Sequence, residues 1–141
     1  MQRKSTDDLQ KELQTAPNLE TFLSENRDEM QSVSFRDYLS DLLRQYKVSK
    51  ANLAKLSEMS EVYIHQIFSG KRNPSRNRTI CIAFALSLTL EETQELLRRA
   101  GHATLYPRFH RDATIIYGLT NRMSLAEIND LLYREDEAAL F

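Results

Sequence analysis

The stretch SKANLAKLSEMSEVYIHQIFSGKRNP, residues 49–74, decides the predicted fold because it joins two helical patterns through a short turn. We expect Ser49 to cap the first helix and Ser60 to cap the second. Gly70 is expected to end the second helix in a left-handed conformation. Ala54 stands where two helices would approach closely. This arrangement is typical of a helix-turn-helix.

Further helical patterns flank this pair. Two of them cover residues 35–48 and 76–88. A third helix follows directly: Thr89 begins it in a capping box with Glu92, and Gly101 ends it. The sequence therefore predicts five helices between residues 34 and 101. Within the central pair, the apolar residues expected to face the core are Leu53, Ala54, Leu56, Ile64, Ile67 and Phe68.

The composition indicates an all-α protein of one domain, or of one domain with an appendage. Only three glycines and three prolines occur in 141 residues, and no run alternates apolar and polar residues as a strand does. The single Cys81 excludes an internal disulfide and fits a reducing compartment. Neither a membrane-spanning apolar run nor a signal peptide is present, so we expect a cytoplasmic protein.

Charge is unevenly distributed along the chain, although the formal net charge is only -1. Residues 1–33 carry a net charge of -3, residues 34–101 carry +4, and residues 102–141 carry -2. These limits also delimit the predicted parts: an N-terminal helical appendage, a helix-turn-helix domain and a C-terminal helical hairpin. A basic centre between acidic flanks favours an anionic partner, but it is weak evidence alone.

Two short helices are predicted in the N-terminal appendage. Ser5 or Thr6 can cap the first, which Pro17 ends, and Asn18 can cap the second over residues 19–30. Its apolar residues Leu19, Phe22 and Leu23 share one face. Both helices are too short to be stable alone in water, so they must pack against something or stay partly unfolded.

Residues 34–101 resemble the lambda-repressor and Cro-like (XRE-type) helix-turn-helix family, whose members bind DNA. The resemblance implies a five-helix DNA-binding domain with a recognition helix near residues 60–69. Two positions depart from the family pattern: Lys50 stands where glutamine is common, and Glu58 stands in a turn where glycine is preferred. The residues that carry the resemblance are Leu53, Ala54, Met59, Ser60, Ile64, Ile67 and the string from Gly70 through Pro74.

The family's binding mode implies which residues of this chain meet double-stranded DNA, because its second helix lies in the major groove. Glutamine can pair with adenine, glutamate can accept a hydrogen bond from cytosine, and basic residues or helix starts can meet phosphates. The implied base contacts are Glu61, Val62, Tyr63 and Gln66. The implied phosphate contacts are Ser49, Lys50, Ser60, Lys71, Arg72, Asn73, Arg76 and Arg78.

The resemblance also implies a homodimer on paired half-sites, since family members usually bind in this way. The function expected is therefore a sequence-specific transcriptional regulator. The alternative is a protein–protein interaction module that keeps the helix-turn-helix scaffold and holds a partner protein. Neither the operator nor the sense of regulation can be read from the residues.

Residues 111–141 align with residues 76–106 at an offset of 35 without a gap, and ten of 31 positions are identical. Both segments read as a helical hairpin with a Ser or Thr cap, a glutamate three positions later and a Leu-aromatic end. Such similarity indicates a repeat, although amphipathic hairpins resemble one another by chance. If the repeat is real, Leu105–Tyr106 and Leu140–Phe141 should occupy equivalent grooves, with a buried C-terminus.

Residues that could support catalysis or bind a cofactor are not arranged for either role. His65, His102 and His110 have no metal-ligand spacing with one another or with Cys81. No phosphate-binding glycine loop or nucleophile motif occurs. We therefore expect no enzyme activity, no metal and no cofactor.

Overall fold

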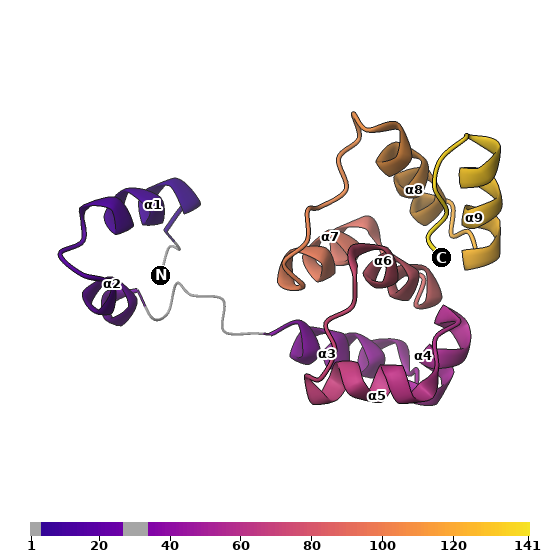
Figure 1. Cartoon of the computed structure of the whole chain (residues 1–141), viewed down its shortest axis with the longest axis horizontal. Coiled ribbons are helices and arrows are strands. Elements are labelled where there is room, and N and C mark those ends of the chain that lie inside the picture. Colours follow the sequence, from indigo (N-terminus) through magenta and orange to yellow (C-terminus); the bar gives the residue numbers. More distant parts are fainter. Residues whose placement is uncertain (1–3, 27–33) are drawn as a thin grey trace. The chain divides into compact units, whose positions relative to one another are not determined.

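The structure, a computed structural model, describes residues 4–26 and 34–141, and all regular elements in these ranges are α-helices (Figure 1). The chain forms two compact units, residues 1–34 and residues 35–141. The all-α prediction is confirmed. No helix within the described ranges is both long and apolar enough to cross a lipid bilayer.

The N-terminal unit contains α1 (Thr6–Thr15) and α2 (Leu19–Glu25). The Ser5 hydroxyl accepts a hydrogen bond from the amide of Asp8 at 3.1 Å, and the Asn18 side chain accepts one from Thr21 at 2.7 Å. Both predicted caps are therefore present. Helix α2 ends at Glu25, and the last four residues of the helix expected over 19–30 lie outside the described residues.

A polar cluster around Asn26 links α1 to α2. The Asn26 side chain accepts a hydrogen bond from Lys4 Nζ at 2.7 Å and donates one to Glu12 at 2.9 Å. Hydrogen bonds from Lys4 and Asn26 lower the pKa of Glu12. Phe22 is the one buried apolar side chain described in this unit, whereas Leu19 and Leu23 are exposed. The apolar face predicted for α2 is therefore largely uncovered within the unit.

The second unit contains seven helices. Most begin at a serine or threonine whose hydroxyl accepts a hydrogen bond from the backbone amide three residues later, which satisfies an otherwise unpaired donor. The helices are α3 (Phe35–Tyr46), α4 (Lys50–Ser57), α5 (Glu61–Ser69), α6 (Arg76–Ala85), α7 (Leu90–Arg99), α8 (His110–Thr120) and α9 (Leu125–Arg134).

Four of the connections share one three-residue design: a left-handed residue, an apolar residue and a hydroxyl cap. The left-handed residues are Lys47, Glu58, Ser87 and Arg122, with φ between 52° and 58°. In each case the amide of the apolar residue bonds the carbonyl five residues earlier at 2.9–3.0 Å, which is a Schellman motif. These connectors turn the chain sharply while keeping backbone groups paired.

The connectors correct two predicted helix ends. Helices were expected over 35–48 and 76–88, but α3 ends at Tyr46 and α6 ends at Ala85. Val48 and Leu88 were expected within these helices and instead occupy the apolar position of a connector. The apolar pattern continued past each helix end because that connector residue also packs on the core.

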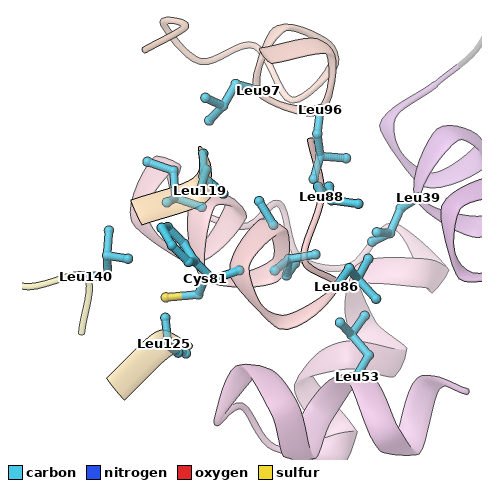
Figure 2. Close-up of a cluster of buried hydrophobic side chains, with 14 of the residues drawn as sticks. Leu39, Leu53, Cys81, Leu86, Leu88, Leu96, Leu97, Leu119, Leu125 and Leu140 are labelled. Carbon is cyan, nitrogen blue, oxygen red and sulfur yellow. The ribbon is translucent and has the colours of Figure 1, made fainter. Parts of the chain in front are cut away.

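The core of the second unit gathers side chains from every helix and from the C-terminal tail. Figure 2 shows a part of this core, in which Leu39, Cys81 and Leu140 come from segments far apart in the sequence. Leu53, Ala54, Ile64 and Ile67 are buried as predicted, and Phe68 is half-buried. Leu56 was expected to face inward, but 49% of it is exposed. It lies about 100° around α4 from the centre of the stripe formed by Leu53, Ala54 and Ser57, so it falls outside the buried face.

The 35-residue correspondence between the two C-terminal hairpins extends to their hydrogen bonds. Arg76 donates from Nε to the carbonyl of Ala103 at 2.9 Å and from Nη2 to that of Thr104 at 3.2 Å. Arg111, 35 residues later, makes the same two bonds to Ala138 and Ala139 at the same distances. Each arginine thereby holds the tail of its own hairpin.

Each tail also buries one leucine in an equivalent way. The amide of Leu105 donates to the side chain of Gln94, and the amide of Leu140 donates to that of Asn129, both at 2.7 Å. Both leucines are 3% exposed. The terminal Phe141 is 65% exposed, so the prediction of a buried C-terminus is right for Leu140 and wrong for Phe141.

The two hairpins exchange contacts reciprocally. Arg76 of the first hairpin pairs with Asp112 of the second at 2.9 Å, and Arg111 of the second donates to Asn77 of the first at 3.1 Å. Asp112 and Asn77 are themselves 35 residues apart. In the same way, α6 packs on α9 and α7 packs on α8. This pattern is that of an isologous interface, so the hairpins face one another about a local pseudo-two-fold axis.

We expect Arg76→Ala to lower the free energy of unfolding by about 3–5 kcal/mol, because it leaves the buried Asp112 carboxylate without its cation. Arg111→Ala is the matched control, since it removes the same carbonyl bonds but leaves only the neutral Asn77 unpaired. Its expected cost is about 1–2 kcal/mol. Urea unfolding measures both. Equal losses for the two variants would contradict the importance of the ion pair.

Candidate nucleic-acid interface

Helices α4 and α5 lie where the sequence predicted the two helices of a helix-turn-helix, and Glu58, Met59 and Ser60 join them. Glu58 adopts the left-handed conformation at φ 58° and ψ 35°, the conformation for which glycine is preferred. Its amide bonds the carbonyls at the end of α4. Met59 is half-buried against the core, and the Ser60 hydroxyl accepts a hydrogen bond from Tyr63 at 3.0 Å. The turn is therefore compact although it contains no glycine.

The first turn of α5 presents its side chains outward. Val62 is 67% exposed. Glu61 is exposed and lies 3.6 Å from His65 Nε2 on the next turn. On the opposite side Ile64 and Ile67 are fully buried. Helix α5 is thus anchored by one face and displays the other.

Two predicted base-contacting residues are each joined to an arginine. The guanidinium of Arg78 stacks over the ring of Tyr63 at 4.5 Å, and Arg72 Nε lies 3.4 Å from Gln66 Oε1. Tyr63 and Gln66 are half-buried. A stacked or bonded arginine keeps its charge while its position is restricted. The contacts therefore place two cations directly beside α5.

A third cation lies beside the other end of α5. The ammonium group of Lys50, in the first turn of α4, lies 4.5 Å from the centre of the Phe68 ring. Three cations therefore lie against side chains of α5: Lys50 from α4, Arg72 from the loop that follows α5, and Arg78 from α6. We call Lys50, Lys71, Arg72 and Arg78 the basic rim.

The loop after α5 is anchored on one side and exposed on the other. Gly70 is left-handed at φ 85° and turns the chain out of the helix. Lys71, Arg72 and Asn73 are exposed, whereas Pro74 is buried and its carbonyl bonds His102 Nε2 at 2.8 Å. The anchored proline keeps the basic part of the loop near the end of α5.

Ser49 and Ser60 occupy the N-cap positions that the sequence predicted. Each hydroxyl accepts a backbone hydrogen bond, from Asn52 at 3.1 Å and from Tyr63 at 3.0 Å. Both residues are exposed, so each hydroxyl can also donate to an acceptor outside the protein. Among the predicted phosphate contacts, these two are neutral donors at helix starts.

Arg76 is placed differently from the other predicted phosphate contacts. Its guanidinium binds Asp112 and two tail carbonyls, and its side chain is 26% exposed. Its principal contacts therefore join the two C-terminal hairpins. The spacing of bases in the sequence could not separate Arg76 from Arg78, because the partner of Arg76 lies 36 residues away.

Arg36 is a further basic residue near this surface that the sequence reading missed. It is exposed near the start of α3, and its Nη1 donates to the carbonyl of Phe68 at 3.4 Å. A cation in the first turn of a helix opposes the helix dipole. That local conflict was the available signal that Arg36 serves a contact elsewhere.

A small pocket of about 260 Å³ lies behind the turn, lined by residues that include Tyr63, Arg78, Cys81 and Phe141. Burial raises the pKa of the Cys81 thiol to about 11, so the thiol stays protonated and unreactive at neutral pH. Among residues 4–26 and 34–141, no three His, Cys, Asp or Glu side chains are grouped to hold a metal ion.

Comparison of the chain with protein-family models, with curated proteins and with solved structures finds no match. The interpretation of this surface therefore depends on its own geometry and charge.

We expect Glu58→Gly to raise the free energy of unfolding by about 1 kcal/mol, because glycine removes the strain of a left-handed side-chain-bearing residue. Lys55→Gly within α4 is the control and should lower it by about 1 kcal/mol. Thermal or urea unfolding compares the two. A loss of stability in both variants would mean that Glu58 makes a contact that outweighs its backbone strain.

Proposed function

We propose that this chain is a sequence-specific DNA-binding transcriptional regulator of the lambda-repressor-like type, acting in the cytoplasm without a cofactor or catalytic step. Helix α5 is the recognition helix of this proposal. The observation that carries it is the exposed face of α5 beside the basic rim. Aromatic or amide contacts hold three residues of the rim, Lys50, Arg72 and Arg78, against that helix.

The chemistry of this face suits a major groove. Val62 offers an apolar contact for a thymine methyl, and Gln66 offers paired donor and acceptor atoms for adenine. Glu61 can accept a hydrogen bond from a cytosine amino group, and its nearby His65 limits repulsion from phosphates when protonated. Tyr63 supports the face through its stack with Arg78. Sequence discrimination is thus assigned to α5.

The basic rim would neutralise phosphates on both sides of the groove. Three of the proposed phosphate contacts lie at helix starts, where backbone amides also favour an anion. They are Ser49, Lys50 and Ser60. Lys71, Arg72 and Asn73 follow α5, and Arg78 lies at its beginning. Arg76 is left out of this interface because its bonds to Asp112 and the tail give it a structural role.

The first experiment is selection of DNA from a random pool by the full chain at about 0.15 M salt. If the protein acts as a homodimer, the retained sequences will contain a paired motif with half-sites about 34 Å apart. Gln66→Ala should relax the preference at one position of each half-site. Retention without any enriched motif would contradict sequence-specific regulation.

A charge-matched pair of variants tests the basic rim. Lys71→Ala combined with Arg72→Ala should reduce the slope of log affinity against log salt by about 2 per protomer, because each removes one phosphate contact. Arg98→Ala combined with Arg108→Ala removes the same charge at exposed positions far along the chain from α5. Fluorescence anisotropy at several salt concentrations measures the slopes. Equal slopes for the two pairs would indicate non-specific attraction alone.

A further inference from the structure

The groove between α8 and α9 is open within residues 35–141. Its volume is about 450 Å³. Tyr117 on its α8 side is 56% exposed, and Leu131 on its α9 side is half-buried. The residues that line it are His110, Ala113, Thr114, Tyr117, Leu131 and Glu135. We call this feature the α8–α9 groove.

The equivalent groove of the first hairpin is covered. The residues that stand 35 positions before three of the lining residues, Thr114, Tyr117 and Leu131, are fully buried. They are Thr79, Ile82 and Leu96, in the same order. Helix α3 packs along α7, and its Leu39 is fully buried in the same core. The first hairpin therefore carries an amphipathic helix on the face that the second hairpin leaves open.

Three contacts hold α3 on α7. The Tyr46 hydroxyl donates a hydrogen bond to Glu92, and Gln45 lies 3.5 Å from the same carboxylate. At the other end, the guanidinium of Arg99 lies 5.2 Å from the Tyr38 ring centre. The bond to Glu92 raises the pKa of Tyr46 to about 12. Two tyrosines eight residues apart are thus held by a glutamate and an arginine seven residues apart.

The residues that hold α3 on α7 recur on α9, where Leu131 lines the α8–α9 groove. Thirty-five residues after Glu92, Leu96 and Arg99 stand the identical residues Glu127, Leu131 and Arg134. Glu127 and Arg134 are exposed in the second hairpin. The second hairpin therefore has the same side chains that hold α3 on the first hairpin. No helix of residues 35–141 packs against them as α3 does.

We propose that the α8–α9 groove binds an amphipathic helix of a partner protein, one that presents two tyrosines eight residues apart with leucines between them. The partner's tyrosines would meet Glu127 and Arg134, and its leucines would cover Tyr117 and Leu131. The chain's own α3 cannot serve, because its leucines are already buried in the core of residues 35–141. This proposal does not depend on DNA binding.

Charge around the groove narrows the kind of partner. Glu127, Asp130 and Glu135 are exposed carboxylates on or beside α9, whereas that helix carries the single guanidinium of Arg134. Glu135 lies 3.3 Å from His110 Nε2, so Glu127 and Asp130 are the carboxylates that this imidazole does not contact. An occupant with net positive charge is therefore favoured over an acidic one. The segment of residues 34–48 has this character, since it carries three bases and two acids around its aromatic and leucine face.

A fluorescein-labelled peptide with the sequence of residues 34–48 is the probe, titrated with the full-length protein in fluorescence anisotropy. The test variant combines Tyr117→Ser with Arg134→Ala. The control combines Tyr133→Ser, a residue that is 84% exposed, with Arg108→Ala. It removes the same groups at positions that neither line the groove nor stand 35 residues after a residue that holds α3. We expect the test variant to weaken binding by about fivefold or more and the control to leave it unchanged.

Amide shifts of the ¹⁵N-labelled wild-type protein, recorded with the same peptide, provide a second readout that needs no variant. Changes concentrated in α8 and α9 support the proposal. No binding, or binding that the test and control variants affect equally, overturns it. The remaining alternative is that a second copy of this chain occupies the groove. Sedimentation of the protein alone tests it. A dimer that the test variant dissociates and the control variant does not would assign the groove to a second copy and overturn the partner proposal.

Discussion

A short connector of left-handed residue, apolar residue and hydroxyl cap is the constraint on which the second unit depends. It occurs after α3, α4, α6 and α8, and each copy joins two helices through three residues. A left-handed residue that carries a side chain costs about 1–2 kcal/mol, whereas a hydroxyl cap contributes about 1 kcal/mol. The two nearly offset one another. Burial of the apolar residue then makes the sharp turn favourable and allows short helices to share one core.

The pseudo-two-fold pairing of the C-terminal hairpins explains why the helix-turn-helix region and residues 102–141 form one compact unit. Arg76 begins α6 directly after the basic loop, and its pairing with Asp112 connects that loop to the second hairpin. His102 adds a second connection through the carbonyl of Pro74. The basic rim is therefore supported from behind by residues that make no proposed contact with DNA. In the proposed complex with DNA, a surface held in this way would have less conformational freedom to lose, which would reduce the cost of association.

Much of the fold could be predicted because its determinants are local. Hydroxyl caps at Ser49, Ser60, Thr89 and Ser124 depend only on neighbouring residues, and each is present as expected. Helix ends were harder to place, since Val48 and Leu88 continue an apolar pattern while belonging to connectors. The candidate interface was read from a resemblance and from the spacing of bases. Arg36 and the distinct placement of Arg76 were missed because their partners are distant in sequence.

By itself, the sequence determined the helical class, most helix starts, the 35-residue correspondence and the concentration of bases after α5. These properties follow from periodicity, capping and charge, which act over a few residues or are visible by alignment. Only the tertiary structure decided which bases stand beside α5 and which one joins the hairpins. It also decided that one hairpin carries α3 while its equivalent remains open. Such choices depend on packing between distant segments, where burial and pairing outweigh local preference.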